Sequence, residues 1–301
     1  MRYRNLLLFV TLSAIWGSAF VAIKAGLADI PPVLFAAIRY DIAGVLVLGY
    51  AAFAVDQWRP RGRTDWAAVA VGAVLLIAGY HALLFVGEQG TTSAAAAVLV
   101  SLSPVLTTGF ARLFLPEERL TTIGIAGLLL GLIGVIVLVR PDPANLLSRD
   151  VVSSALVFGA ALSFALGSVL TRWLDAGLPI ETMEAWSMVG GALLMHLLAL
   201  ALPGESLATV SWTPRAFVSL GYLSLVASAV GFLLYFDLLD RLGPVEINLV
   251  SYLAPVVAAV VGFVFLGEVI DAATGVGFLF ILSGFVLLKR RALATELDRR
   301  R

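Results

Sequence analysis

Runs of about 20 mainly apolar residues, the length at which an α-helix crosses a bilayer, recur ten times along the chain. They occupy residues 6–27, 34–53, 66–87, 94–115, 123–139, 151–173, 183–202, 217–239, 247–266 and 273–288. The runs are continuous and rich in Leu, Ala and Val, unlike the alternating ten-residue segments of outer-membrane barrels. The pattern therefore predicts an all-α integral membrane protein with ten transmembrane helices.

The segments between the runs are short, and most contain turn-forming residues such as Pro31-Pro32 and Gly243-Pro244. No linker is long enough to hold a soluble domain. Arg2 and Arg4 precede the first run, as in a signal peptide. That run is longer than a signal sequence requires and has no clear cleavage site after it, so we expect it to be retained as a helix.

Composition narrows the class of protein further. Hydrophobic residues make up 60% of the 301 residues and charged residues 13%, whereas soluble domains contain about 45–50% and 25%. Lys and Arg together equal Asp and Glu at 20 each, so no basic excess favours nucleic acid. The chain has no Cys and two His, which leaves little material for a metal centre. We expect no metal, no cofactor and, without a Walker-type loop, no direct use of ATP.

Basic residues are distributed unevenly between the two sides of the membrane that ten spans define. With the N-terminus inside, 15 of the 20 Lys and Arg residues lie in cytoplasmic segments and three lie in external ones. Cytoplasmic loops of membrane proteins are enriched in Lys and Arg. We therefore expect both termini in the cytoplasm.

The two halves of the chain resemble each other at an offset of 150 or 151 residues. The matching positions are Leu12-Ser13 and Gly17-Ser18 with Leu162-Ser163 and Gly167-Ser168, Ser103-Pro104-Val105 with Ala254-Pro255-Val256, and Gly134 with Gly284. Each half holds five spans, and an odd number makes the second half enter the membrane from the opposite side. We expect inverted repeats at 1–140 and 151–291, followed by a charged cytoplasmic tail at 292–301. This design is typical of secondary transporters with a central substrate site, although channels also contain it and duplication also serves packing alone.

Several motifs occur in an order that resembles a known family. Trp16-Gly17-Ser18-Ala19-Phe20 lies in the first run, Arg39-Tyr40 in the second, and residues 114–121 follow the fourth. Together they are similar to the drug/metabolite transporter superfamily, in its EamA-type branch, across nearly the whole chain. Pro116 stands where Gly is more usual, and the seventh run has no Arg that matches Arg39. The resemblance implies a multi-pass protein of a bacterial or archaeal cytoplasmic (inner) membrane that exports amino acids or related small metabolites, most like the aromatic amino-acid exporters.

Pro104 and Pro255 lie inside the fourth and ninth runs. A proline inside a helix removes one hydrogen bond and blocks the carbonyl four residues earlier, which here belongs to Val100 or Ser251. The freed carbonyls would face a central cavity, or the prolines would act as hinges. The alternative is that each proline only bends its helix for packing.

The ninth run also carries a polar face at helical spacing, made of Asn248, Ser251, Tyr252 and Pro255. In the first repeat, Ser101 is the equivalent of Tyr252. Such a face points at protein or water rather than lipid, so it favours either substrate contact or hydrogen bonds between helices.

Tyr80-His81 in the third run adds a group that titrates near neutral pH. His81 would couple transport to protons, donate one hydrogen bond to the substrate, or pack as a neutral ring. Aromatic residues are candidate cavity walls, with interfacial or lipid-facing positions as the alternative. The predicted substrate cavity comprises Trp16, Tyr80, His81, Ser101, Pro104, Trp186, Tyr235, Asn248, Ser251, Tyr252 and Pro255, with Pro104 and Pro255 as hinges.

Charged side chains are expected to avoid the middle of the membrane. Arg39 lies about two turns into the second run, near enough to the surface to snorkel as a structural anchor. Glu88 and Glu184 fall near the ends of spans, where water solvates them. The nearly charge-free centre favours a neutral or zwitterionic substrate held by apolar and aromatic walls.

The favoured function is an exporter that works by alternating access. A drug or other hydrophobic-metabolite exporter and a non-saturable channel or facilitator are the alternatives. An intramembrane enzyme needs clustered catalytic groups, and only Asp41 and His81 are available, so we expect no enzymatic activity. The expected partners are a small-molecule substrate and the lipid bilayer, with no nucleic acid, and the protein is expected to be a monomer or a weak homodimer.

Overall fold

The computed structural model describes residues 2–115, 122–141, 144–242 and 247–299. Residues 116–121 of the predicted motif at 114–121 and the predicted turn at 243–244 lie outside these residues. Within the described ranges, eight helical segments are long and apolar enough to cross a bilayer, and two further apolar helices are shorter. The eight are Tyr3–Gly26, Pro32–Ala54, Arg63–Glu88, Ser93–Phe114, Thr122–Val139, Arg149–Leu174, Ile180–Ala201 and Pro214–Leu239, and the shorter two are Val250–Leu266 and Ala272–Leu288. The ten predicted spans are confirmed.

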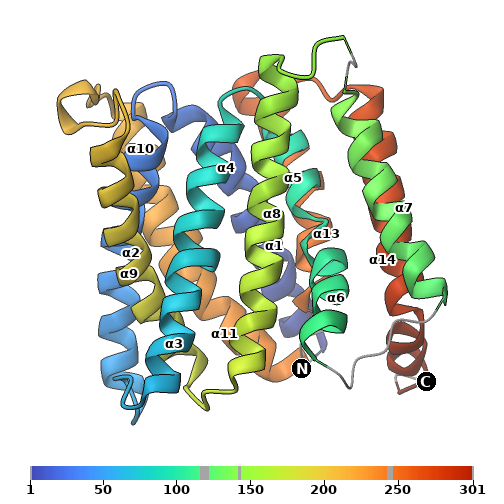
Figure 1. Ribbon diagram of the computed structural model, residues 1–301, viewed down its shortest axis with the longest axis horizontal. Coiled ribbons are helices and arrows are strands. Elements are labelled where there is room, and N and C mark those ends of the chain that lie inside the picture. Colours follow the sequence, from blue (N-terminus) through green and yellow to red (C-terminus); the bar gives the residue numbers. More distant parts are fainter. Residues whose placement is uncertain (1, 116–121, 142–143, 243–246, 300–301) are drawn as a thin grey trace.

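Most spans are single helices: α1 (Arg2–Gly26), α2 (Pro32–Ala54), α7 (Thr122–Val139), α8 (Arg149–Leu174), α9 (Ile180–Ala201), α13 (Val250–Leu266) and α14 (Ala272–Arg299). Both ends of the chain lie on the same side of the molecule, which we call the terminal end (Figure 1). α1 rises from the terminal end, whereas its repeat equivalent α8 starts on the opposite side and descends (Figure 1). Equivalent helices therefore run in opposite directions, as an inverted repeat requires.

The third and eighth spans depart from regular α-helix at equivalent places. The third consists of α3 (Arg63–Val71), the π-helical η1 (Gly72–Gly79) and α4 (Tyr80–Glu88). The eighth consists of α10 (Pro214–Gly221), the π-helical η3 (Tyr222–Val230) and α11 (Gly231–Leu242). The two π-helical segments begin 150 residues apart. Such segments are rare and often mark functional sites.

The fourth span is broken between α5 (Ser93–Val100) and α6 (Ser103–Phe114). Pro104 therefore lies in the first turn of α6 and not inside a continuous helix. Proline is well tolerated there, because the first N–H groups of a helix have no intrahelical partner. Its counterpart Pro255 does lie inside α13, which begins after a turn at Asn248 and Leu249.

The two halves interlock. α1 packs on α13, and its equivalent α8 packs on α5 and α6, while α2 packs on α9 and α7 packs on α14. Glycines permit the close approach: a Cβ at Gly17 in α1 would lie 2.5 Å from the carbonyl oxygen of Ala254 in α13. The largest hydrophobic core therefore contains residues of both halves.

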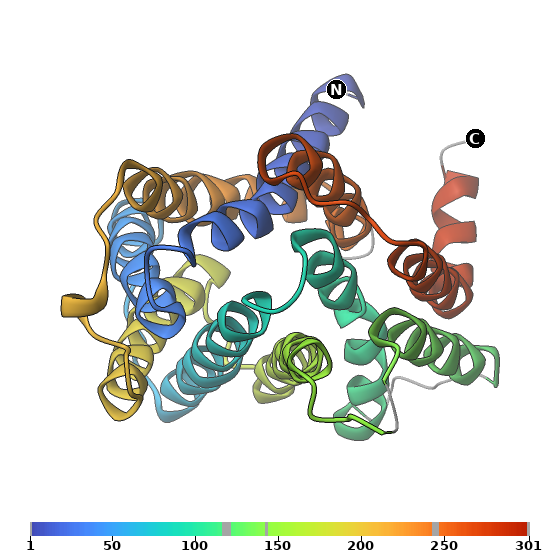
Figure 2. The same ribbon diagram turned by 90° about the horizontal axis from the view of Figure 1, so that it is seen from above.

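α7 and α14 pack together at one edge of the molecule (Figures 1 and 2). A Cβ at Gly127 would lie 2.6 Å from the carbonyl oxygen of Gly284, and one at Gly131 would lie 2.8 Å from the Leu102 side chain. Gly127 and Gly131 therefore allow α7 to pack closely against its neighbours. An ion pair of 3.2 Å between Arg140 and Asp271 joins the ends of the two helices.

Candidate functional site

A cavity of about 640 Å³ lies between the two halves. Its wall includes Trp16, Arg39, Tyr40, Tyr80, His81, Pro104, Thr107, Thr108, Phe164, Ser168, Arg172, Glu184, Phe232, Tyr235, Asn248 and Ser251. Arg172 lies in the last turn of α8 and Glu184 near the start of α9, and both of these helix ends lie at the terminal end. The cavity therefore extends from membrane depth toward the terminal end.

Arg39 occupies the deep end of the cavity. Its side chain was expected to extend to the membrane surface instead. Arg39 is only 6% exposed, and its Nε donates a 3.0 Å hydrogen bond to Ser228 Oγ in η3. The guanidinium carbon lies 5.1 Å from the centre of the Tyr40 ring and 6.0 Å from that of Phe85. The snorkelling interpretation is wrong, because α2 is covered by neighbouring helices at this level.

His81 and Tyr40 form a buried pair beside Arg39. The Tyr40 hydroxyl lies 2.7 Å from His81 Nε2, and His81 Nδ1 lies 2.9 Å from the carbonyl oxygen of Ile77. Because a carbonyl only accepts hydrogen bonds, Nδ1 carries the proton of a neutral ring and Nε2 accepts from Tyr40. Both ring nitrogens are therefore occupied without a substrate, as in the packed alternative.

Aromatic side chains form much of the wall between Arg39 and the terminal end. Trp16 Nε1 donates a 3.2 Å hydrogen bond to the carbonyl oxygen of Ala227 in η3. The Trp16 ring lies 6.0 Å from that of Phe232 and 5.5 Å from that of Tyr235. Tyr80 packs 5.4 Å from Phe164. These contacts link helices of opposite halves across the cavity.

Among the predicted cavity residues, seven are on the wall: Trp16, Tyr80, His81, Pro104, Tyr235, Asn248 and Ser251. The carbonyl of Val100, which Pro104 was expected to free, accepts a 2.7 Å hydrogen bond from Ser103 Oγ. It is therefore already partnered across the break between α5 and α6.

Four predicted residues are not among those on the wall. Ser101 is buried and bonds to the carbonyl oxygen of Val98 at 2.7 Å. Trp186 donates a 2.9 Å hydrogen bond to the carbonyl oxygen of Trp58, away from the deep site. The Tyr252 ring packs at a tilt against Phe285, with 4.5 Å between the ring centres, and Pro255 is buried inside α13. The predicted polar face, from Asn248 to Pro255, is longer than the part that lines the cavity. Only Asn248, in the turn before α13, and Ser251 in α13 are on the wall.

The two acidic residues that were expected to be solvated at the span ends differ in their surroundings. Glu184 lines the cavity mouth. Glu88, the last residue of α4, is fully buried, and neither of its carboxyl oxygens has a hydrogen-bond partner within the described part of the chain. This burial depends on the tertiary packing around α4, which no pattern in the apolar runs indicates.

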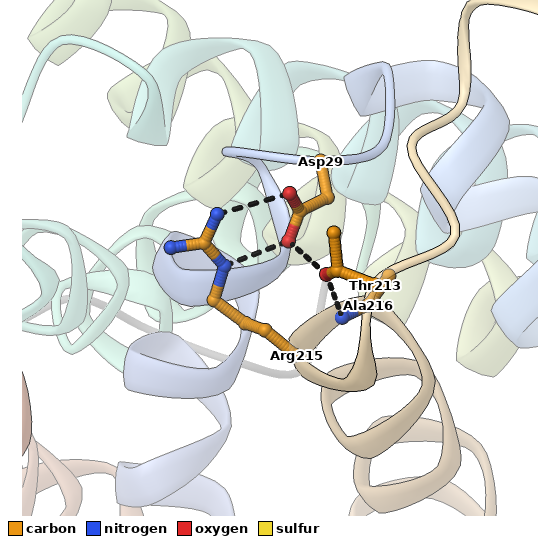
Figure 3. Close-up of polar contacts among 4 residues, drawn as sticks. All are labelled: Asp29, Thr213, Arg215 and Ala216. Atoms are coloured by element: carbon orange, nitrogen blue, oxygen red, sulfur yellow. Dashed lines mark hydrogen bonds and ion pairs between the residues drawn. The ribbon is translucent and has the colours of Figure 1, made fainter.

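The side opposite the terminal end, which we call the closed end, is held together by polar contacts between loops. Lys24 Nζ donates to the carbonyl oxygens of Glu88 and Thr91 at 2.8 Å each and of Gln89 at 3.2 Å. Further contacts at this end are made by Glu205 with the backbone N–H groups of Val33 and Leu34, by Glu268 with Ser93, and by Asp29 with Thr213 and Arg215 (Figure 3). None of the side chains of Lys24, Asp29, Glu205, Arg215 and Glu268 is on the cavity wall.

Comparison with known proteins adds a family to this geometry. The model of the EamA-like transporter family matches the chain twice, at residues 4–140 and 152–290. The chain is 30% identical over 276 residues to the "Uncharacterized inner membrane transporter YedA" of Escherichia coli K12, covering 90% of this chain and 87% of that one. It is 32% identical over 280 residues to the "Probable terminal-alkyne amino-acid exporter" of Streptantibioticus cattleyicolor, covering 92% and 91%.

Two further matches extend over nearly the whole length. The "Uncharacterized transporter YvbV" of Bacillus subtilis is 28% identical over 293 residues, covering 97% of this chain and 94% of that one. One solved crystal structure superposes with a TM-score of 0.67 at 23% identity, covering 97% of this chain and 99% of the other. At that identity the superposition shows a shared fold.

Proposed function

This chain belongs to the EamA-like transporter family, and from that premise we propose that it is a secondary transporter that exports amino acids or related small metabolites by alternating access. The family is one of membrane transporters and not of enzymes. The observation that carries the proposal is the 640 Å³ cavity between two interlocked inverted halves. Its lining reaches the terminal end, while polar contacts hold the closed end together.

The size and lining of the cavity support a small substrate with an apolar part. A cavity of this volume falls in the range of small-molecule sites, and the rings of Trp16, Tyr80 and Tyr235 offer flat apolar contact. The relative from Streptantibioticus cattleyicolor carries an amino-acid exporter name, which supports the amino-acid class. A drug or other hydrophobic-metabolite exporter, or a channel, remains the alternative.

We assign substrate contact to the predicted residues on the wall: Trp16, Tyr80, His81, Pro104, Tyr235, Asn248 and Ser251. We assign no substrate contact to Ser101 and Trp186, and we expect Tyr252 to support the wall from behind through its contact with Phe285. Pro255, which blocks the carbonyl of Ser251 inside α13, is proposed as one hinge, and Pro104 at the α5–α6 break as the other.

The proposed orientation places both termini in the cytoplasm of a bacterial or archaeal cell. The uneven distribution of Lys and Arg supports it, as does the inner-membrane name of the Escherichia coli relative. With this orientation the cavity faces the cytoplasm, where an exporter loads its substrate.

Uptake into proteoliposomes tests the proposal. Purified protein is reconstituted, and labelled Thr, Met, Phe, Tyr and Trp are supplied with and without an imposed proton gradient. We expect saturable uptake of a subset. Trp16→Ala is expected to reduce it about tenfold, which corresponds to about 1.4 kcal/mol of lost binding. Trp212→Ala serves as the control, because Trp212 is exposed in a loop and stacks on Phe217.

The outcomes separate the competing functions. Flux that never saturates, or single-channel conductance, would contradict the transporter proposal in favour of a channel. Saturable transport of a dye or drug with no amino-acid uptake would favour the alternative substrate class. A response to the proton gradient would indicate proton coupling, and unchanged coupling in His81→Ala would exclude His81 as its site.

A further inference from the structure

The charge on Arg39 is buried at membrane depth without an opposite charge. Arg39 lies seven residues after Pro32, the first residue of α2, which places it about 10 Å along the helix from the closed end. Within the described ranges, no carboxylate lies at ion-pair distance from it, although buried charges are normally paired. Glu88 interacts electrostatically with the guanidinium, but a directly paired anion is absent among the described residues, and a ligand in the cavity could supply it.

The hydrogen-bonding groups of Arg39 are mostly unused. A guanidinium has five N–H donors, and the one bond recorded within the described residues runs from Nε to the neutral hydroxyl of Ser228. The two Nη atoms have no hydrogen bond within the described residues, and they are not buried either. Arg39 is on the cavity wall. The Nη edge is therefore accessible from the cavity.

The acidic residues nearest to the cavity are badly placed to neutralise Arg39. Glu184 lies four residues into α9, which begins at the terminal end. For helices of this length, Glu184 and Arg39 are separated along the membrane normal by on the order of 15–20 Å. Glu88, buried at the closed end, interacts electrostatically with Arg39, but it forms no ion pair with it and is not on the cavity wall. The mouth contains both an acidic and a basic side chain, Glu184 and Arg172, whereas Arg39 is the charged residue of the deep end.

We propose that Arg39 binds the carboxylate of the transported molecule through its Nη edge. The inference rests on the proposed transport function and specifies its substrate class: a small molecule with a carboxylate at one end and an apolar body that packs on the aromatic wall. Paired N–H donors of a guanidinium match the two oxygens of a carboxylate. Among the described residues of the cavity wall, the acidic side chain is Glu184 at the mouth and none lies beside Arg39, so we expect the amino group of an amino acid to be dispensable for binding.

Four compounds that share a phenyl body test the inference on the wild-type protein. They are L-phenylalanine, 3-phenylpropionate, L-phenylalaninamide and 2-phenylethylamine, titrated into the purified protein by calorimetry and used as uptake substrates in proteoliposomes. We expect the two carboxylates to bind, and the amide and the amine to bind about 10- to 100-fold more weakly. Equal binding of all four would overturn the role of Arg39 and leave transport intact.

Variants locate the effect. Arg39→Gln is expected to reduce the affinity for both carboxylates to that for the amide while leaving the amide unchanged, and Arg39→Lys is expected to keep part of the preference. Arg241→Gln is the control, because Arg241 is paired with Asp237 and is not on the cavity wall. Unchanged carboxylate binding in folded Arg39→Gln would overturn the inference. If the variant does not fold, the four-compound comparison on the wild type decides alone.

Failure of the inference and failure of the proposed function give different results. Saturable uptake of a cationic dye such as ethidium, with no binding of either carboxylate, would refute the Arg39 inference and retain a transporter. Absence of saturable transport of the amino acids, the four compounds and the dye would refute the proposed function, and the inference with it.

Discussion

Asp29 lies in the loop between α1 and α2, where Arg215 of α10 donates two hydrogen bonds to its carboxylate at 2.7 and 2.9 Å (Figure 3). The hydrogen bond from Arg215 lowers the pKa of Asp29 below its ordinary value, against the opposing effect of burial. A lowered pKa in the folded state contributes stability that is fully present above the ordinary pKa of about 4 and is lost as the pH falls through the lower value. Asp29→Asn is therefore expected to reduce the unfolding temperature at pH 7, with the difference from wild type disappearing as the pH falls below about 4.

Thermal unfolding in detergent between pH 3 and pH 7 measures this difference. The matched control is Asp237→Asn, which removes the pair with Arg241 on the surface of α11. Exposed pairs contribute little, so its unfolding temperature should follow wild type at every pH. A constant difference between Asp29→Asn and wild type down to pH 3 would contradict the linkage to the Asp29 carboxyl.

Residue identity was enough to predict part of the candidate site. Asn248 and Ser251 were found because helical spacing places polar residues on one face, and they do line the cavity. The sequence places Arg39 inside a span. Whether its side chain reaches water or the cavity depends on which helices cover α2. Burial of Glu88 likewise depends on how α4 packs against the helices around it. Such packing is a property of the assembled helices, and a single sequence does not reveal it.

At the scale of helices, the contact between α7 and α14 depends on the absence of side chains. A Cβ at Gly134 would lie 2.7 Å from the carbonyl oxygen of Gly277, closer than carbon and oxygen normally approach. Gly134→Ala must therefore push the two helices apart, and we expect it to destabilise the protein by roughly 1–3 kcal/mol, as overpacking does. The unfolding temperature in detergent measures the effect.

Gly49→Ala in α2 is the control for this substitution. A Cβ at Gly49 would have no atom within 4 Å, and alanine is favoured over glycine in helices by roughly 0.5–1 kcal/mol. Gly49→Ala should therefore unfold at the same temperature as wild type or higher. Equal stability of the two variants would show that the α7–α14 contact can relax without cost.

The ten helices could be predicted because each apolar run is long and bounded by turn residues. The internal repeat then required the inversion, since each half has five spans. The π-helical segments η1 and η3 could not be predicted in this way. Their wider turns change which residues share a helix face, but they leave the length and the apolarity of the run unchanged. The pattern of apolar runs gives only that length and that apolarity.

The whole molecule has two sides, and the proposed orientation assigns the terminal end to the cytoplasm. A green fluorescent protein fused after the C-terminus should therefore fluoresce, and alkaline phosphatase fused there should be inactive. Alkaline phosphatase inserted at η2 (Leu207–Thr209), at the closed end, should be active, because this enzyme requires export to form its disulfides. The reverse pattern in living cells would place the termini outside and make the cavity face outward.

The glycine contacts between α7 and α14 have the pattern of a symmetric dimer. Gly127 meets Gly284 and Gly134 meets Gly277, and at the repeat offset of 150 Gly127 corresponds to Gly277 and Gly134 to Gly284. This is an isologous interface, in which the same patch is used by both partners, except that both partners belong to one chain. A dimer of two separate chains with such an interface would dissociate on dilution. In the fused chain the two patches are always present at equal numbers, and their association does not depend on protein concentration.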